Sequence, residues 1–148
     1  MNDIDLTLHV KHFAELSTTE LYEIIKARFG VFYLEQAIRY PDLDDVDYQA
    51  VHIFLTVGRT VVAYARLYHD EADNLWHAGR VLTLQRLKGH GRQVMEAAER
   101  YAHQQGATLL HVNAQLQAEA FYQALGYQRA TPQFIEANLP HIGMRKTL

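Results

Sequence analysis

The chain has 148 residues, of which 49% are hydrophobic and 21% charged, with only 3 prolines and 8 glycines. This composition is typical of an ordinary globular protein, and the length favours a single domain over residues 1–148. The 14 basic and 17 acidic side chains give a net charge of −3. This charge argues against a nucleic-acid partner, because such binding needs a basic surface.

Cysteine is absent, which excludes a disulfide framework, a thiolate metal site and a cysteine nucleophile. The first ten residues carry Asp3 and Asp5 and lack the basic and apolar regions of a signal peptide. No apolar run approaches the ~20 residues that cross a bilayer. We therefore expect a cytoplasmic protein without a membrane partner.

The N-terminal half predicts a strand, a helix and an antiparallel meander. Apolar and polar residues alternate over residues 4–13, as in a half-buried strand. Ser17 and Glu20 have the spacing of a capping box, and helical periodicity then extends to Gln36. Gly30 inside this helix predicts a kink or the close approach of another backbone. Three β-rich runs follow, the first two joined by a Gly58-Arg59 hairpin turn: residues 51–57, 60–68 and 75–84.

The C-terminal half changes to alternating helices and strands. Helical spacing predicts helices over residues 89–105 and 118–125, and short apolar runs predict strands over 108–113 and 141–146. A strand, a crossover helix and a second strand make a parallel pair. We therefore expect an α/β (α+β) fold that combines this pair with the antiparallel meander. Uncovered strand edges in so small a domain are also compatible with a homodimer.

The most informative segment is the turn Arg86-Leu87-Lys88-Gly89-His90-Gly91-Arg92, between a predicted strand and a predicted helix. Such a turn points backbone N–H groups at one spot, adds the positive end of the helix dipole and lets an anion approach its glycines. No acidic residue occurs from Asn74 to Met95. The segment therefore predicts a phosphate cradle, with a plain strand-to-helix turn and a solvated basic face as the alternative.

Two motifs give this turn a family context. The first is Arg86-x-x-Gly89-x-Gly91. It resembles the Q/R-x-x-G-x-G/A signature of the GNAT superfamily of N-acetyltransferases, where the signature binds the pyrophosphate of acetyl-CoA. The second motif resembles a downstream element of the same family, with Gln where Asn is commoner: Gln115-x-x-Ala118-x-x-Phe121-Tyr122-x-x-x-Gly126-Tyr127.

Further motifs are similar to the ElaA-like branch of that family, so the resemblance covers most of the chain. They are Arg28-x-x-Val31-Phe32-x-x-Glu35-Gln36, the segment from Asp44 to His52, and Pro140-His141-Ile142-Gly143-Met144. The chain departs from this branch between Gly79 and Arg86, where it is shorter.

The resemblance implies a mostly antiparallel central sheet with a parallel, splayed strand pair and flanking helices. Pantetheine would insert between the splayed strands and pair with exposed backbone groups. A direct transfer is also implied, in which an amine attacks the thioester and Tyr122 protonates the leaving thiolate. The alternative for Tyr122 is a core aromatic residue. The residues implied for binding acetyl-CoA are Val81, Leu82, Thr83, Arg86, Leu87, Lys88, Gly89, His90, Gly91, Arg92 and Gln115.

The residue inventory independently favours direct transfer. Without cysteine, and with a single serine, Ser17, that is suited to capping a helix, a covalent acyl-enzyme has almost no nucleophile to use. For the general base we expect Glu35, because a partly buried glutamate can have its pKa raised towards neutrality and the resembled fold puts this helix end beside the acceptor cleft. The alternative for Glu35 is a surface carboxylate, and His52 and His141 are rival bases.

An acidic loop precedes the second strand and contains Asp42, Asp44, Asp45 and Asp47. It is either a solvated loop or a group of negative charges that attracts a cationic amine. The candidate contacts of the amine substrate are Asp44 in this loop, His52 and His141. We expect Arg28, in an apolar helical stripe, to snorkel or to pair with a carboxylate. The 9 histidines form no tight ligand cluster in the sequence, and we expect no metal.

Together these features predict an N-acetyltransferase that moves an acetyl group from acetyl-CoA to a primary amine of a small molecule or peptide within a ternary complex. The acceptor is not specified, because loops that vary within one fold determine it. Two alternatives stay open. One is an acyl-CoA-binding sensor or interaction module without turnover, and the other is a structural domain whose basic turn binds anions adventitiously.

Overall fold

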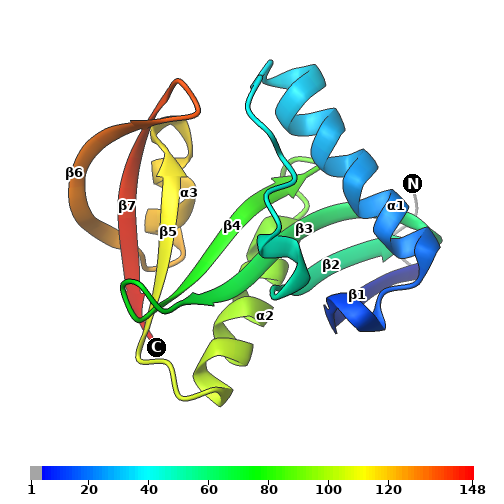
Figure 1. Cartoon of the computed structure of the whole chain (residues 1–148), viewed down its shortest axis with the longest axis horizontal. Coiled ribbons are helices and arrows are strands. Elements are labelled where there is room, and N and C mark those ends of the chain that lie inside the picture. Colours follow the sequence, from blue (N-terminus) through cyan, green and yellow to red (C-terminus); the bar gives the residue numbers. More distant parts are fainter. Residues whose placement is uncertain (1–4) are drawn as a thin grey trace.

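A computed structural model describes residues 5–148 as one seven-stranded sheet with the order β1-β2-β3-β4-β5-β7-β6 (Figure 1). Its strand pairs are antiparallel except for β4 with β5. This mixed, mostly antiparallel sheet with flanking helices confirms the predicted fold class. The strands are β1 (Leu6–His12), β2 (Val51–Val57), β3 (Thr60–Asp70), β4 (Leu75–Thr83), β5 (Leu109–Gln115), β6 (Gln128–Glu136) and β7 (Leu139–Thr147).

Helices cover both faces of the sheet. α1 (Thr18–Arg28) packs on one face, and α2 (His90–Gln104) and α3 (Glu119–Ala124) lie on the other. Successive side chains of a strand point to opposite faces, so Ile53 joins the cluster under α2 while Phe54 joins the cluster under α1. No helix within residues 5–148 is long and apolar enough to cross a membrane.

The first predicted strand and the beginning of the first predicted helix are both present. Of the strand predicted over 4–13, Ile4 lies outside the described residues, and β1 is an edge strand. Ser17 caps α1 and accepts the Glu20 N–H, while the Glu20 carboxylate accepts the Ser17 N–H. This reciprocal pair confirms the capping box.

The helix predicted to reach Gln36 changes type after Arg28. Residues Phe29–Glu35 form a π-helical segment, whose wider turns continue the coil of α1. Gly30 lies in this segment, and no heavy atom beyond its chain neighbours and its own helix backbone lies within 4 Å of the position that its Cβ would occupy. The irregularity that Gly30 indicated is therefore present, whereas the predicted close approach of another backbone is wrong.

Strand β6 was not predicted. Its residues are mostly exposed, they lack the apolar alternation of a half-buried strand, and Pro132 falls in the register shift between Arg129 and Gln133. Such features fit the outer edge of a sheet, where one flank needs no partner. A two-residue turn, Ala137 and Asn138, joins β6 to β7 with positive φ at both positions.

β4 and β5 pair at their beginnings and then separate. Three parallel residue pairs join them, the last being Ala78 with Val112. Beyond Gly79 the register of β4 against β3 shifts, and Arg80 adopts a positive φ of 52°. Such a bulge bends a strand and increases its twist. Figure 1 shows the two strands diverging, which opens the sheet on one side of β4.

Three arginines and three aspartates hold the loop after the π-helical segment against the sheet. Arg28, 1% exposed, donates to the Asp42 carboxylate at 2.8 Å and to the Asp47 carboxylate at 2.7 Å. Its pairing with carboxylates confirms one of the two expectations for this residue. His52 Nε2 bonds the Asp47 carbonyl oxygen at 2.9 Å, and Nδ1 bonds the Tyr64 hydroxyl at 2.7 Å. We call this set the Arg–Asp network: Arg28, Arg66, Arg80, Asp42, Asp44 and Asp47.

The sheet supplies the other two arginines of the network. Arg66 on β3 grips the Asp44 carboxylate with two hydrogen bonds of 2.7 Å and reaches Asp47 at 3.2 Å. Arg80 on β4 donates to Asp42 at 2.8 Å and to Asp44 at 3.4 Å. The three aspartates are therefore neutralised by three arginines, and the loop that carries them is fixed to α1, β3 and β4.

We expect Asp47→Asn to lower the free energy of unfolding by about 2–4 kcal/mol, because it leaves two buried guanidinium groups short of a counter-charge. Asp45→Asn is the matched control. Asp45 has a positive φ of 66°, a conformation that asparagine tolerates well, so this variant should unfold like the wild type. Urea unfolding followed by Trp76 fluorescence would measure both, and equal effects of the two variants would contradict the network's role.

The environment of Asp47 also predicts how the stability of the protein depends on pH. Burial opposes ionisation of Asp47, but the hydrogen bond and charge of Arg28 and the charge of Arg66 hold its pKa below the ordinary value of 3.8. A lowered folded-state pKa stabilises the protein above the unfolded pKa, and this contribution is lost as the pH falls through the folded pKa. The stability difference between wild type and Asp47→Asn should therefore be full near neutrality and shrink below about pH 4.

Candidate active site

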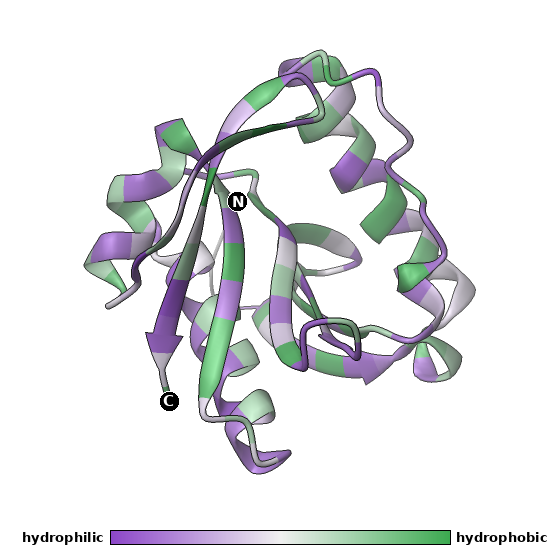
Figure 2. Cartoon of the chain, turned by 60° about the vertical axis from the view of Figure 1, so that its left-hand side comes forward, coloured by the Kyte–Doolittle hydropathy of each residue, from purple (hydrophilic) through white to green (hydrophobic). Residues whose placement is uncertain are grey.

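A cavity of about 620 Å³ lies where the sheet opens. The end of α1, the π-helical segment and the acidic loop form one side, and the β6–β7 turn lies opposite. Figures 1 and 2 both show this turn beside the C-terminal end of the α1 coil, so the two sides meet at the same end of the molecule. The lining residues fall within 25–44, 66–68, 77–81, 113–118 and 136–141, with Tyr122 in addition.

Tyr122 on α3 lines this cavity and is otherwise buried. Its ring packs edge-on against the rings of Phe121 and Tyr127 at centroid distances of 5.0 and 5.7 Å. Burial raises the pKa of the Tyr122 hydroxyl well above its ordinary value, so the group stays protonated at neutral pH. A tyrosine whose ring is packed and which lines a cavity can serve as a proton donor there.

The diverging part of β4 offers backbone groups to the gap. Leu84 donates its N–H to the Val62 carbonyl of β3. Backbone groups of successive strand residues point alternately to the two flanks of the strand, so those of Val81 and Thr83 point away from β3. Parallel pairing with β5 ends at Ala78, which leaves this flank of Val81 and Thr83 open. The Leu82 side chain is buried under α1 and its backbone groups point towards β3, so Leu82 directs neither into the gap.

The turn 84–89 leads into α2, whose first two residues, His90 and Gly91, are buried. Leu87 and Gly89 have positive φ angles of 63° and 76°. The first hydrogen bond of the helix runs from the Gln93 N–H to the Gly89 carbonyl, so three N–H groups of the first turn have no partner within the helix. Exposed N–H groups at the positive end of a helix dipole form an anion site. Arg86 and Arg92 extend their side chains beside it into solvent.

Gly91 and His90 serve the packing of this turn. A Cβ at Gly91 would lie 3.0 Å from the Phe121 ring and 3.3 Å from the Thr83 methyl group. The lack of a side chain at Gly91 therefore lets α2 pack against α3 and β4. His90 is buried, and both of its ring nitrogens lack a hydrogen-bond partner among residues 5–148. Burying such groups without a partner costs stability.

Gln115 stands where β5 ends, in the cavity lining. Its amide nitrogen donates to the Gln36 side chain at 2.9 Å, and its amide oxygen accepts from Gln117 at 2.8 Å. This chain of three amides joins the end of the π-helical segment to β5 across the mouth of the open sheet. The side chain predicted to contact acetyl-CoA therefore also bridges the two sides of the cavity.

Two of the predicted catalytic or substrate residues lie outside the cavity lining. The Glu35 side chain is 55% exposed and pairs with Arg86 at 3.1 Å, so the partial burial on which its choice as base rested is absent. His52 is buried behind the Arg–Asp network with both ring nitrogens engaged. Burial lowers the pKa of His52 and keeps its ring neutral.

His141 and Asp44 do line the cavity. The His141 Nδ1 donates to the Leu139 carbonyl at 2.8 Å, which in the neutral ring leaves Nε2 as the basic nitrogen. That Nε2 lies 3.6 Å from the Glu136 carboxylate. Asp44 is held by Arg66, and the hydrogen bonds and charge of Arg66 lower its pKa, with burial opposing. Its charge is therefore matched within the protein.

Several lining residues were missed by the sequence analysis. Glu136 lies just before the Ala137-Asn138 turn of an unpredicted strand, and Asn113 was read only as the end of a strand. His77 on β4 and Tyr68 on β3 also line the cavity, with rings stacked at a centroid distance of 5.3 Å. The sequence alone does not show which polar strand residues line a cavity, because the position of the cavity depends on where β4 separates from β5.

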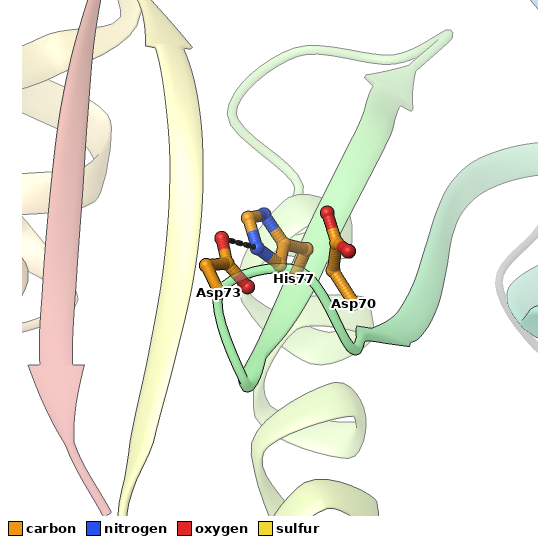
Figure 3. A group of neighbouring side chains, drawn as sticks. All are labelled: Asp70, Asp73 and His77. Atoms are coloured by element: carbon orange, nitrogen blue, oxygen red, sulfur yellow. Dashed lines mark hydrogen bonds and ion pairs between the residues drawn. The ribbon is translucent and has the colours of Figure 1, made fainter.

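The expectation of no tight ligand cluster needs a correction at the β3–β4 turn. Figure 3 shows Asp70, Asp73 and His77 together, with potential ligand atoms within 4.8 Å of one another. His77 Nε2 bonds the Asp73 carboxylate at 2.7 Å. The two carboxylates also accept backbone N–H groups of Ala72 and Leu75, so they shape the turn. These bonds give the cluster a structural role without a metal.

Comparison with known proteins agrees with this geometry. A family model described as an acetyltransferase (GNAT) domain matches residues 30–148. Protein ElaA of Escherichia coli is 33% identical over 141 residues, which cover 91% of this chain and 92% of ElaA. A UPF0039 protein of Schizosaccharomyces pombe is 31% identical over 143 residues, which cover 93% of this chain and 95% of that protein.

Solved structures show the same fold. The crystal structure of an acyl-CoA N-acyltransferase from Pseudomonas aeruginosa has a TM-score of 0.87 at 30% identity and covers 96% of this chain and 99% of that chain. The crystal structure of E. coli ElaA has a TM-score of 0.86 at 31% identity and covers 95% of this chain and 99% of that chain. The chain therefore belongs to the GNAT acetyltransferase family, whose co-substrate is an acyl-CoA, and within it to the branch that contains ElaA.

Proposed function

We propose that this protein is an N-acetyltransferase that transfers an acetyl group from acetyl-CoA to a primary amine by direct attack. The observation that carries the proposal is the opening between β4 and β5, where free backbone groups and Tyr122 meet one cavity. Membership of the GNAT family supports acyl-CoA as the donor. We further propose that the protein acts in the cytoplasm as a single domain.

The chain offers a separate group for each part of acetyl-CoA. The N–H groups of His90, Gly91 and Arg92 suit the pyrophosphate, with Arg86 and Lys88 adding positive charge nearby. The open flank of β4 at Val81 and Thr83 suits the amides of the pantetheine arm, which need hydrogen-bond partners of the same kind as a β-strand. This assignment directs the thioester towards the cavity that Tyr122 lines.

Transfer needs one proton removed and one supplied. The amine nitrogen forms a bond to the acetyl carbon, the carbon–sulfur bond of the thioester breaks, and the sulfur leaves as a thiolate. We assign the Tyr122 hydroxyl to protonate that thiolate, since Tyr122 lines the cavity and its hydroxyl carries a proton at neutral pH. The chain's lack of cysteine and its use of Ser17 as a helix cap support transfer without an acyl-enzyme.

His141 is our proposed base in place of Glu35. Among the three candidates for this role, His141 lines the cavity, whereas Glu35 and His52 are engaged elsewhere. Its Nδ1–H is occupied by a carbonyl oxygen, so Nε2 is the nitrogen that can take the proton lost by the amine.

Calorimetric titration with acetyl-CoA tests the function directly, with inorganic phosphate at equal ionic strength as the control for simple anion binding. We expect saturable one-to-one binding of acetyl-CoA that phosphate does not reproduce, and release of free thiol when a suitable amine is added. Binding without thiol release from any amine would favour the alternative of an acyl-CoA sensor. Absence of binding would overturn the proposal.

Gly89→Val should weaken acetyl-CoA binding roughly tenfold or more, because a β-branched residue is strained at a φ of 76° and the turn must rearrange. Gly58→Val is the matched control. It puts the same side chain at a φ of 59° in the β2–β3 turn, with equally open surroundings. The control should lose stability but keep its affinity for acetyl-CoA, and unchanged affinity in Gly89→Val would contradict the cradle.

Tyr122→Phe should lower kcat about a hundredfold while acetyl-CoA affinity stays unchanged, because the ring is kept and only the proton donor is lost. Tyr101→Phe removes a hydroxyl that contacts His12 outside the cavity and serves as the control. Steady-state kinetics by thiol release, with calorimetry for affinity, separates the two effects. Full activity of Tyr122→Phe would exclude Tyr122 as the acid.

His141→Gln should also lower kcat about a hundredfold at neutral pH, and the deficit should shrink as the pH rises because hydroxide can then remove the proton. His69→Gln, at a half-buried position that contacts Asn74 and lies outside the cavity lining, should match the wild type. A purely structural effect of His141 would leave a deficit that does not change with pH, and this result would exclude His141 as the base.

A further inference from the structure

The carboxylates in the cavity lining differ in how they are held. Asp42 and Asp44 are ion-paired with arginines of the Arg–Asp network. Glu136 is instead contacted by an amide, Asn113 Nδ2 at 3.5 Å, and by His141 Nε2 at 3.6 Å. Its side chain is 50% exposed. Glu136 therefore presents a negative charge to the cavity that a bound cation can share.

A chain of hydrogen bonds orients the groups around Glu136. Arg145 donates to His111 Nδ1 at 3.1 Å, which makes the His111 Nε2 the protonated nitrogen of a neutral ring. That Nε2 donates to the Asn113 oxygen at 2.6 Å, and the Asn113 NH₂ group is thereby turned towards Glu136. Burial lowers the pKa of His111, which favours this neutral form. The Glu136 carboxylate is thus positioned by the Asn113 amide, while the rest of the carboxylate remains open to the cavity.

The opposite side of the cavity is aromatic. The Phe29 and Tyr33 rings stack at a centroid distance of 4.9 Å, yet these residues are 49% and 47% exposed. Tyr40 and Leu43 continue this surface and are also exposed, and all four residues line the cavity. Apolar side chains held open to a cavity gain free energy when an apolar ligand covers them. We call these four residues the aromatic wall.

We propose that the acceptor is a primary monoamine on an apolar, preferably aromatic, body, with its ammonium group on Glu136 and its body against the aromatic wall. The inference rests on the proposed function and names the substrate class for the same site. An ammonium held by Glu136 lies beside His141 Nε2, the proposed base. The loss of one proton to that nitrogen converts the bound ammonium into the neutral nucleophile. His141 then releases this proton to solvent, so that it can accept the second proton, which the nitrogen loses during acyl transfer.

Other classes of amine fit this cavity less well. A polyamine carries further positive charges, and the remaining lining carboxylates, Asp42 and Asp44, are already neutralised by arginines. An amino sugar has many hydroxyl groups, and the aromatic wall offers them few hydrogen-bond partners. The distribution of charge and apolar surface therefore selects for one ammonium group and an apolar remainder.

Acetylation of three probe amines tests the substrate class: 2-phenylethylamine, spermidine and glucosamine, each with saturating acetyl-CoA and thiol detection. We expect the highest kcat/KM for 2-phenylethylamine, by roughly tenfold or more over the other two. A preference for spermidine or glucosamine would overturn the inference. Binding of 2-phenylethylamine to the CoA-loaded protein, followed by NMR, provides a second readout that needs no turnover.

Glu136→Gln tests the ammonium site and Phe29→Ala tests the wall. Glu136→Gln should raise the KM for 2-phenylethylamine about ten- to a hundredfold, because it removes a charge-assisted contact. Phe29→Ala should raise the same KM by less and leave the KM for spermidine unchanged. Glu71→Gln removes an equal charge from the exposed β3–β4 turn and serves as the control. An unchanged KM in Glu136→Gln would overturn the assignment.

Affinity for acetyl-CoA distinguishes a wrong substrate class from a wrong proposed function. All variants in this series should bind acetyl-CoA as the wild type does, since none of these residues belongs to the proposed acetyl-CoA site. If the wild type binds acetyl-CoA but neither binds nor acetylates 2-phenylethylamine, the substrate class is wrong and the proposed function stands. If the wild type does not bind acetyl-CoA, the proposed function itself fails.

Discussion

The charge pairing of three arginines with three aspartates is the constraint on which the active-site architecture depends. Arg28 comes from the end of α1, Arg66 and Arg80 come from neighbouring strands, and the aspartates belong to one loop. Ions taken out of water need excellent geometry and full hydrogen bonding to repay their desolvation. The loop therefore has little freedom, and with it one whole side of the cavity is fixed.

The second determinant is strand β4, which changes its role along its length. Its first residues are ordinary members of the sheet, paired on both flanks, whereas the residues after the bulge at Arg80 are paired on one flank. Because Arg80 also belongs to the Arg–Asp network, the same residue marks the bend of the strand and fixes the loop above it. The backbone around Arg80 thus determines both where the sheet opens and where the loop of the Arg–Asp network lies.

Local patterns in the sequence predicted most of the elements but few of the partners. The β-rich run over 51–57 and the capping box at Ser17 depend on near neighbours, so both were recognisable and both are confirmed. The carboxylate partners of Arg28 lie 14 and 19 positions away, and only the fold brings them together. Glu35 was chosen for a burial that no pattern could measure, and β6 was missed because an exposed edge strand needs no apolar periodicity.

The absence of a side chain at Gly91 has a consequence for how the beginning of α2 is connected to α3. The Phe121 ring fills the space over Gly91 at the first turn of α2, and Phe121 precedes Tyr122 in α3. The first turn of α2, which we propose holds the pyrophosphate, is therefore linked to the residue next to Tyr122 by a single ring contact. A side chain at position 91 would displace that ring, so the packing at the beginning of α2 limits where the α3 segment that carries Tyr122 can lie.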